Sequence, residues 1–274
     1  MTTYNAAPLP FQGQKRFFLR AFRAALAHFP DEAIYVDLFG GSGLLSHTVR
    51  AVKTRARVIW NDYDNYQRRL DLIPRTNELR QKLEELLKGE GSKAKINHRK
   101  TEIATLLGHY PTEQLDCLTL SANLLFSGNY ANTIEELLTQ GMYNRVRSTP
   151  YDAHDYLMDV ERRSQDYREL IAEFAPMKPV VFIFDPPYLG TDVSSYHKAN
   201  YWTLRDYLDV IKHLAGRPYY FYFGSNRSHL IDLLDFLAME MNFGSPLAGA
   251  TRETVNNRVN YGSSYQDIML YKYL

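Results

Sequence analysis

The amino-acid sequence predicts an α/β fold, a doubly wound sheet with an inserted, mainly helical region of about 100 residues. Alternating strand and helix patterns occur up to about residue 65 and return after about residue 165. Between these two groups no such alternation is evident. A glycine-rich turn at 39–43 follows the first predicted strand, at the position where folds of this class bind their ligands.

The first group of elements is a βαβ unit. Apolar residues spaced along one helix face predict a helix over 16–29. A strand over 34–38 then leads through the glycine turn into a helix over 44–53, and a second strand is predicted at 57–60.

The central part of the chain predicts helices only. Leucines over 79–87 are spaced as in an amphipathic helix. Two further helices are expected at about 101–109 and 133–140, the second because Thr133 and Glu136 have the spacing of a capping box. We therefore expect a helical insertion between the two strand-containing parts.

The last part returns to alternating strands and helices. A wholly apolar strand is predicted at 180–184, where every position is suited to a buried sheet. The following elements are a helix at 204–214, a strand at 219–223, a helix at 230–241 and a strand at 266–271.

The composition excludes several classes of protein. Of 274 residues, 45% are hydrophobic and 23% charged, which is typical of a folded domain and not of a disordered chain. The single cysteine, Cys117, permits neither an internal disulfide nor a cysteine zinc cluster, and we predict no metal site. Because an export signal and long apolar runs are both missing, we expect a cytoplasmic protein that does not enter a membrane.

Charge is distributed unevenly along the chain. Lys and Arg (32) nearly balance Asp and Glu (31) overall, but residues 50–100 hold 14 basic against 7 acidic side chains, a local excess of +7. A solvated surface would explain this excess, and so would phosphate binding. Candidates for phosphate contacts are Arg68, Arg69, Lys93, Lys95, Arg99 and Lys100.

The turn from Asp37 to Gly43 is a candidate nucleoside-binding loop. Glycines there allow a ligand to approach the backbone closely. The dinucleotide pattern G-x-G-x-x-G is incomplete because Ser46 occupies the third glycine position, and no Lys follows as a Walker-type loop requires. Asp62, 19 residues after Gly43, is placed to accept hydrogen bonds from a ribose. An adenosine-containing cofactor is therefore expected, although a tight turn alone would also account for the glycines.

The segment Asp185-Pro-Pro-Tyr188 follows the apolar strand at 180–184. Two prolines end the strand and fix the backbone, so the Asp185 carboxylate and the Pro186 carbonyl are held as acceptors beside the Tyr188 ring. Acceptors without donors can bind the hydrogens of an amino group, and the ring can stack on a base that carries it. An ordinary turn at the end of a strand is the alternative.

Together, Asp37–Gly43 and Asp185–Tyr188 resemble the motifs of S-adenosylmethionine-dependent amino-methyltransferases, in the order found in Dam-type DNA adenine methyltransferases. Pro10–Lys15 is similar to the N-terminal cofactor segment of that family, with Gln14 where a second glycine is usual. Gln165–Tyr167 resembles the family's acid–aromatic pair, and Asp166 lies 19 residues before Asp185. Further similarity is present at Met142–Arg145, Gly224–Asn226 and Tyr265–Tyr271.

The resemblance implies a Rossmann-like methyltransferase sheet with an S-adenosyl-L-methionine site. The implied cofactor residues are Phe11, Lys15, Asp37, Phe39, Gly41, Gly43, Asp62, Asp166 and Tyr167. The implied catalytic residues are Asp185, Pro186, Pro187 and Tyr188. The catalytic domain would comprise residues 1–66 and 161–274, with a target-recognition domain at 67–160.

The implied reaction is methylation of the exocyclic amino nitrogen of a flipped adenine in double-stranded DNA, at a specific site. Some members of such a family act with a cognate restriction enzyme, and the sequence does not decide whether one exists here. The motifs also leave open cytosine or RNA as the acceptor. A nicotinamide-dependent oxidoreductase would use the glycine loop and Asp62 but would leave Asp185–Tyr188 unexplained. A non-catalytic nucleic-acid-binding module would leave both motifs without a purpose.

Overall fold

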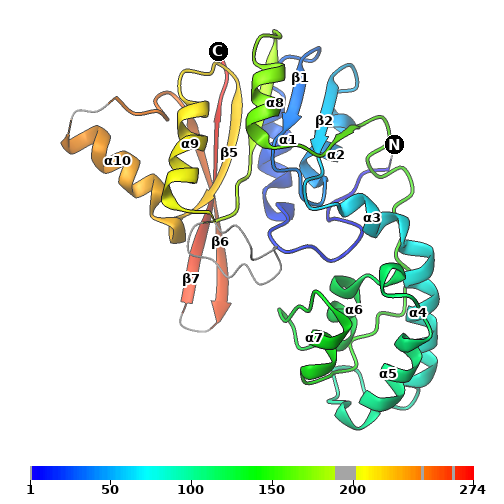
Figure 1. The fold of residues 1–274 in the computed structure, drawn as a ribbon. Coiled ribbons are helices and arrows are strands. Elements are labelled where there is room, and N and C mark those ends of the chain that lie inside the picture. Colours follow the sequence, from blue (N-terminus) through cyan, green and yellow to red (C-terminus); the bar gives the residue numbers. More distant parts are fainter. Residues whose placement is uncertain (1, 189–201, 242–243, 261–262) are drawn as a thin grey trace.

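A seven-stranded sheet is formed within the described part of the chain, residues 2–188, 202–241, 244–260 and 263–274 of a computed structural model (Figure 1). The strands are β1 Ile34–Asp37, β2 Arg57–Asn61, β3 Glu161–Arg163, β4 Val180–Phe184, β5 Tyr220–Ser225, β6 Thr251–Asn260 and β7 Ser263–Lys272. Their order is β3-β2-β1-β4-β5-β7-β6. The first five strands in the sheet order, β3-β2-β1-β4-β5, all run parallel to one another. Strand β7 is antiparallel to both β5 and β6.

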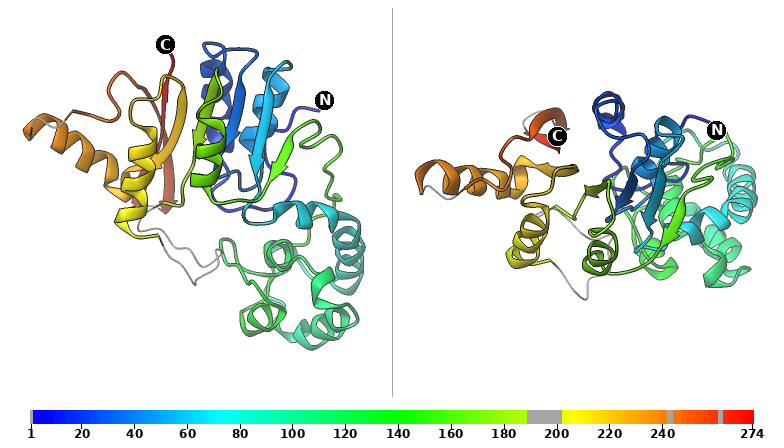
Figure 2. Two further views of the ribbon diagram at one scale, coloured as in Figure 1. Left: turned by 45° about the horizontal axis from the view of Figure 1, so that its top comes forward. Right: turned by 90° about the horizontal axis from the view of Figure 1, so that it is seen from above.

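Helices cover both faces of this sheet, which confirms the doubly wound prediction (Figure 2). One face is covered by the 3-10 turn η1 Arg16–Phe18 and by α1 Leu19–Leu26 and α2 Leu44–Val52. The other is covered by α8 Tyr167–Phe174, α9 Leu204–Leu214 and the first turns of α10 Leu230–Glu240. Because neither face meets water, β4 has an apolar side chain at every position. A short 3-10 turn, η5 Asn226–Ser228, follows β5.

The segment between β2 and β3 folds into helices. They are α3 Tyr66–Asp71, α4 Ile73–Leu86, η2 Asn97–Arg99, α5 Lys100–Gly108, η3 Thr112–Gln114, α6 Cys117–Leu124 and α7 Ile134–Thr139. Helices α4 to α7 pack around a core of their own, to which α3 does not belong. Buried leucines of α4 and α6, among them Leu79, Leu83 and Leu120, belong to this core. Figure 1 shows these helices as a lobe beside the sheet, and a smaller cluster that includes Trp60 and Tyr66 joins the two parts.

Most predicted elements are present within a few residues of their expected bounds. The predicted helix over 16–29 begins as η1 and ends at Leu26. Sequence patterns did not indicate β3, β6, α3, α6 or α8. Strand β3 has three residues, all charged, and lies at one edge of the sheet, so it carries no apolar alternation. No helix in the described ranges is both long and apolar enough to cross a membrane.

Candidate active site

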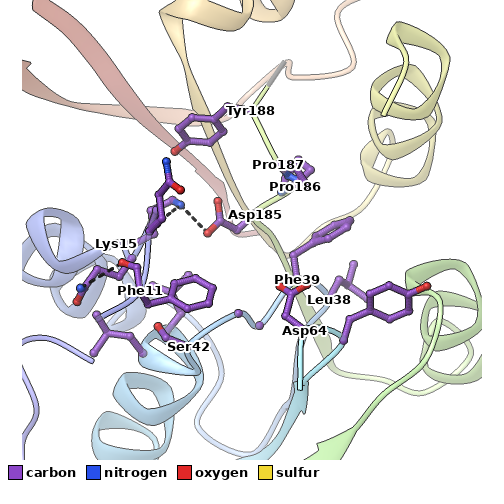
Figure 3. Close-up of a pocket in the computed structure, with 18 of the residues that line it drawn as sticks. Phe11, Lys15, Leu38, Phe39, Ser42, Asp64, Asp185, Pro186, Pro187 and Tyr188 are labelled. Atoms are coloured by element: carbon purple, nitrogen blue, oxygen red, sulfur yellow. Dashed lines mark hydrogen bonds and ion pairs between the residues drawn. The ribbon is translucent and has the colours of Figure 1, made fainter. Parts of the chain in front are cut away.

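A cavity of 1330 Å³ opens where β1 and β4 end (Figure 3). These strands are parallel neighbours, and Asp37 pairs with Ile183, so the segments that follow both strands meet at one edge of the sheet. The cavity walls come from the N-terminal segment 10–17, the glycine loop, the start of α8 and the segment after β4. The structure thereby brings together, as cavity-lining residues, Phe11, Lys15, Phe39, Gly41, Asp166, Tyr167, Asp185, Pro186, Pro187 and Tyr188.

The glycine loop is shaped by two close contacts. A Cβ atom on Gly40 would lie 2.2 Å from Cδ1 of Trp60, so only glycine fits there. A Cβ atom on Gly41 would lie 2.9 Å from the Phe11 ring, and Gly41 has a φ of +45°. Gly43 precedes α2 with a φ of +75° but does not line the cavity. Sequence reasoning missed Gly40 because nothing in the pattern indicates how close Trp60 lies.

Asp37, the last residue of β1, is a buried carboxyl group behind the loop. It is 1% exposed, and the Ser46 hydroxyl donates a hydrogen bond to Oδ2 over 2.7 Å. Its other oxygen, Oδ1, is buried and has no hydrogen-bond partner within residues 2–188, 202–241, 244–260 and 263–274. The pKa of Asp37 is raised to about 7, chiefly by burial and also by nearby Asp185, against the lowering effects of the Ser46 hydrogen bond and of Lys15. The group therefore changes charge near neutral pH.

Lys15 and Asp185, which both line the cavity, form an ion pair (Figure 3). Lys15 Nζ lies 2.6 Å from Asp185 Oδ2 and also donates to the Gly13 carbonyl over 2.7 Å. The ammonium lies 5.0 Å from the centroid of the Tyr188 ring. Burial raises the pKa of Asp185, and Lys15 opposes that rise. Oδ1 of Asp185 is buried and has no hydrogen-bond partner among the described residues, which leaves an acceptor for a ligand's hydrogen-bond donor.

Aromatic rings form one wall of the cavity. The Phe39 ring centroid lies 5.1 Å from that of Tyr167 and 5.5 Å from that of Trp202. The Tyr167 hydroxyl donates to Asp209 over 2.7 Å, which fixes the ring. Such a wall suits a planar heterocycle. Trp202 was not predicted, because its contribution depends on how α9 packs and not on a local motif.

Asp166 and Gln165 lie beside this wall. The Asp166 carboxylate accepts from the backbone and guanidinium of Arg168, both over 2.9 Å, so it caps α8. Asn61 holds Gln165 in place, because its side chain donates to the Gln165 carbonyl (3.0 Å) and accepts from the Gln165 N–H (3.0 Å). The same side chain donates to the Leu38 carbonyl (2.9 Å). The side-chain oxygen of Gln165 is buried, and no described residue gives it a hydrogen bond. Gln165 is thus a cavity-lining acceptor that the motif analysis did not assign.

Asp62 lies outside the group of cavity-lining residues. It is fully buried, accepts from the backbone N–H groups of Tyr66 and Gln67 at the start of α3, and pairs with Arg162 over 2.8 Å. Asp64, two residues later, does line the cavity. The ribose contact expected of Asp62 stays a prediction.

The sheet order, the glycine loop after β1 and the Asp-Pro-Pro-Tyr segment after β4 together define a Rossmann-like methyltransferase. The chain belongs to the D12 class N6 adenine-specific DNA methyltransferase family, whose model matches residues 11–221. It is also 35% identical over 280 residues to a Haemophilus influenzae protein named "Putative methyltransferase", and the match covers 99% of this chain and 93% of that protein. The Dam-type resemblance is confirmed, and enzymes of this family use S-adenosyl-L-methionine.

Binding of S-adenosyl-L-methionine should strengthen from about pH 6 to about pH 8 as Asp37 loses its proton, because the cofactor is cationic. We expect up to about a tenfold increase in affinity for a group that titrates near the middle of this range. Asp37→Asn removes the titrating carboxyl group at this position. Any pH dependence that remains in this variant then reports ionisation of the cofactor itself. Calorimetric titrations of both proteins across the range test this, and equal pH profiles would contradict it.

Gly41→Val should weaken cofactor binding by about tenfold or more, because its side chain would displace the Phe11 ring from the cavity wall. Gly216→Val is the matched control. Gly216 also has a positive φ, +75°, but a Cβ atom there would meet nothing within 4 Å among the described residues beyond its chain neighbours. Both variants suffer backbone strain, and only the first should lose affinity. An equal loss in both would assign the effect to strain.

Proposed function

We propose that this methyltransferase transfers a methyl group from S-adenosyl-L-methionine to N6 of adenine in double-stranded DNA, with the target nucleotide flipped into the cavity. The observation that carries the proposal is the Asp185 carboxylate, which follows β4, pairs with Lys15 through one oxygen, and has no hydrogen-bond partner for the other oxygen in the part of the chain that the structure describes. Family membership supports the choice of adenine and DNA. It gives no support to the nicotinamide alternative.

The cavity fits a cofactor and a base together. Its 1330 Å³ exceeds the roughly 300 to 1,000 Å³ of a typical small-molecule pocket. Its surroundings include buried acceptor oxygens on Asp37, Gln165 and Asp185 that lack hydrogen-bond partners in the described ranges, and such oxygens suit the amino groups of these ligands. We assign the cofactor to Phe11, Lys15, the glycine loop and the Phe39–Tyr167 wall, near Asp37 and Asp166. When bound, S-adenosyl-L-methionine supplies an activated methyl group on a sulfonium.

Asp185 and Pro186 would activate and orient the target amine. The lone pair of an adenine amino group is delocalised into the ring, so this nitrogen is a weak nucleophile. Acceptors at Asp185 Oδ1 and the Pro186 carbonyl would hold its two hydrogens, favour a pyramidal nitrogen and stabilise the positive charge that develops during transfer. Pro187 restricts the backbone, so these acceptors are fixed before substrate binds.

Tyr188 would stack on the flipped base. A base within a duplex cannot reach such a cavity, so it must leave the helix, and stacking on an aromatic ring is typically worth about 1 to 3 kcal/mol. Lys15 would keep the carboxylate of Asp185 oriented while Oδ1 binds the amine. In a variant that lacks Lys15, we therefore expect the Tyr188 ring to remain available for stacking and the Asp185 carboxylate to lose its alignment.

We assign residues 67–160 to target recognition, with phosphate contacts on the exposed basic side chains. Among the candidates, Lys93, Lys95 and Arg68 are exposed, although Arg68 donates to the Glu113 carbonyl over 2.7 Å. Two others are engaged within the protein: Arg69 pairs with Asp116 over 3.0 Å, and Arg99 bonds to Glu102 and the Leu86 carbonyl. Arg69 is only 11% exposed, so its prediction as a phosphate contact is corrected. A cognate restriction enzyme stays a prediction of the resemblance alone.

Asp185→Ala should lower the rate of methyl transfer by about 10²-fold or more, the scale of losing one preorganised electrostatic contact. Cofactor affinity should change much less, because the proposed cofactor contacts lie on other residues. Asp185→Asn keeps the shape of the side chain and tests whether its charge is needed. Single-turnover transfer and cofactor titration are measured in parallel.

The acceptor is tested in the same experiment with matched duplexes that contain or lack adenine, and with structured RNA. Transfer to adenine-free DNA or to RNA at a comparable rate would replace the proposed acceptor. Near-normal transfer by Asp185→Ala would remove the catalytic assignment.

Lys93→Gln and Lys95→Gln should each weaken DNA binding and reduce the salt dependence of the affinity, by about 0.9 in the log–log slope for each lost phosphate contact. Lys212→Gln is the control, because Lys212 is an exposed lysine on α9, outside the helical lobe. Fluorescence anisotropy over a range of salt concentrations measures the slopes. Slopes equal to that of the wild type would leave the basic segment as a solvated surface.

A further inference from the structure

Arg69 of α3 lies largely buried, 11% exposed, between the helical lobe and the N-terminal segment that lines the cavity. Its Nε atom donates to both carboxylate oxygens of Asp116, over 3.0 and 3.1 Å. Its Nη2 atom donates to the Pro10 carbonyl over 2.8 Å and to the Thr119 hydroxyl over 3.2 Å. One guanidinium therefore bonds to the lobe and to the N-terminal segment at the same time.

The lobe side of this contact is rigid. Asp116 is 2% exposed and caps α6, where it accepts hydrogen bonds from the Thr119 N–H over 3.2 Å and the Thr119 hydroxyl over 2.5 Å. The flanking residues Leu115 and Leu120 belong to the lobe's hydrophobic core. Movement of α6 would therefore be transmitted to Arg69.

The N-terminal side leads directly into the cavity. The Arg69 guanidinium lies 5.2 Å from the Tyr66 ring centroid, and the Tyr66 hydroxyl accepts from the Leu9 N–H over 3.1 Å. The Tyr66 ring meets Phe11 edge-on at 5.5 Å. Phe11 covers Gly41, and Lys15 at the end of the same segment holds Asp185.

We propose that Arg69 and Asp116 are a positioning pair that fixes the cofactor-binding segment against the target-recognition lobe, and that this pair couples DNA binding to cofactor binding. The inference rests on the proposed function, because it takes segment 10–15 to bind the cofactor and the lobe to bind DNA. A planar guanidinium can donate hydrogen bonds to a carboxylate and to a carbonyl in different directions. A lysine ammonium cannot reproduce that geometry. Loss of the pair should loosen Phe11 and Lys15 without removing either residue.

The test is Arg69→Lys, which retains the charge. Calorimetry gives the dissociation constant for S-adenosyl-L-methionine without DNA and with saturating adenine-containing duplex, and the ratio of the two constants measures the coupling. We expect the constant without DNA to rise about tenfold or more, and the ratio to move toward one. DNA affinity without cofactor, and its salt slope, should equal those of the wild type. A phosphate-contacting arginine would instead lower both.

Two further variants keep the test decisive. Thr119→Val removes one hydroxyl partner of Arg69 without leaving a buried charge, and it should shift the constant and the ratio in the same direction by a smaller factor. Arg75→Lys is the matched control, because Arg75 pairs with Glu78 within the lobe and has no contact with the N-terminal segment in the described residues. It should leave both quantities unchanged.

The outcomes separate this inference from the proposed function. If folded Arg69→Lys has the cofactor affinity and the coupling of the wild type, the positioning role is overturned. If Arg69→Lys does not fold, the same result with Thr119→Val overturns it. Methyl transfer by the wild type would uphold the proposed function in either case. A wild-type protein that binds no cofactor or transfers no methyl group would overturn the proposed function itself. Equal effects of Arg69→Lys and Arg75→Lys would show general destabilisation of the lobe and would also overturn the inference.

Discussion

Two carboxyl groups, Asp37 and Asp185, must share one buried edge of the sheet because the strands that carry them are parallel neighbours. Each raises the cost of charging the other, and burial adds to that cost. Lys15 is the cation that offsets it, through direct contact with Asp185 and a longer-range effect on Asp37. The N-terminal segment that carries Lys15 is therefore part of the electrostatics of the site as well as part of its wall.

Contacts between side chains and the backbone keep this arrangement in place. Asn61 at the end of β2 joins the segment after β1 to the residue that precedes Asp166. Gly40 lets the loop pack directly on Trp60. These contacts come from strand ends and not from flexible surface loops, so the positions of the functional groups follow from the register of the sheet.

Local patterns could predict the strands and helices that bury a continuous apolar face. Strand β4 is apolar throughout, and α1 and α9 bury regularly spaced residues, so each was recognised from its sequence alone. The charged residues of β3 and the polar residues of β6 gave no such signal, because edge strands have fewer neighbours to bury. The helices missed in the lobe are short, and their packing depends on residues far away in the sequence.

The residues of the candidate active site could also be predicted only in part from the sequence. Motif spacing indicated the residues near the cofactor loop and the segment after β4, and the fold brings most of them into one cavity. Spacing could not show that Asp62 already accepts from backbone N–H groups at the start of α3, that Trp202 completes an aromatic wall, or that Arg69 pairs with Asp116. Each of these depends on which distant side chain occupies a partner position.

The two outermost strands have a consequence for the behaviour of the protein at high concentration. An uncovered strand can serve as a template on which another copy of the chain adds its own strand, the first step of aggregation. Here one border is the very short β3, whose Glu161 is paired with Arg57 and Arg163. The opposite border is β6, whose residues 251–254 and 256 are exposed and polar. Another chain would have to desolvate these groups before pairing, so the sheet borders themselves favour solubility over fibre-like growth.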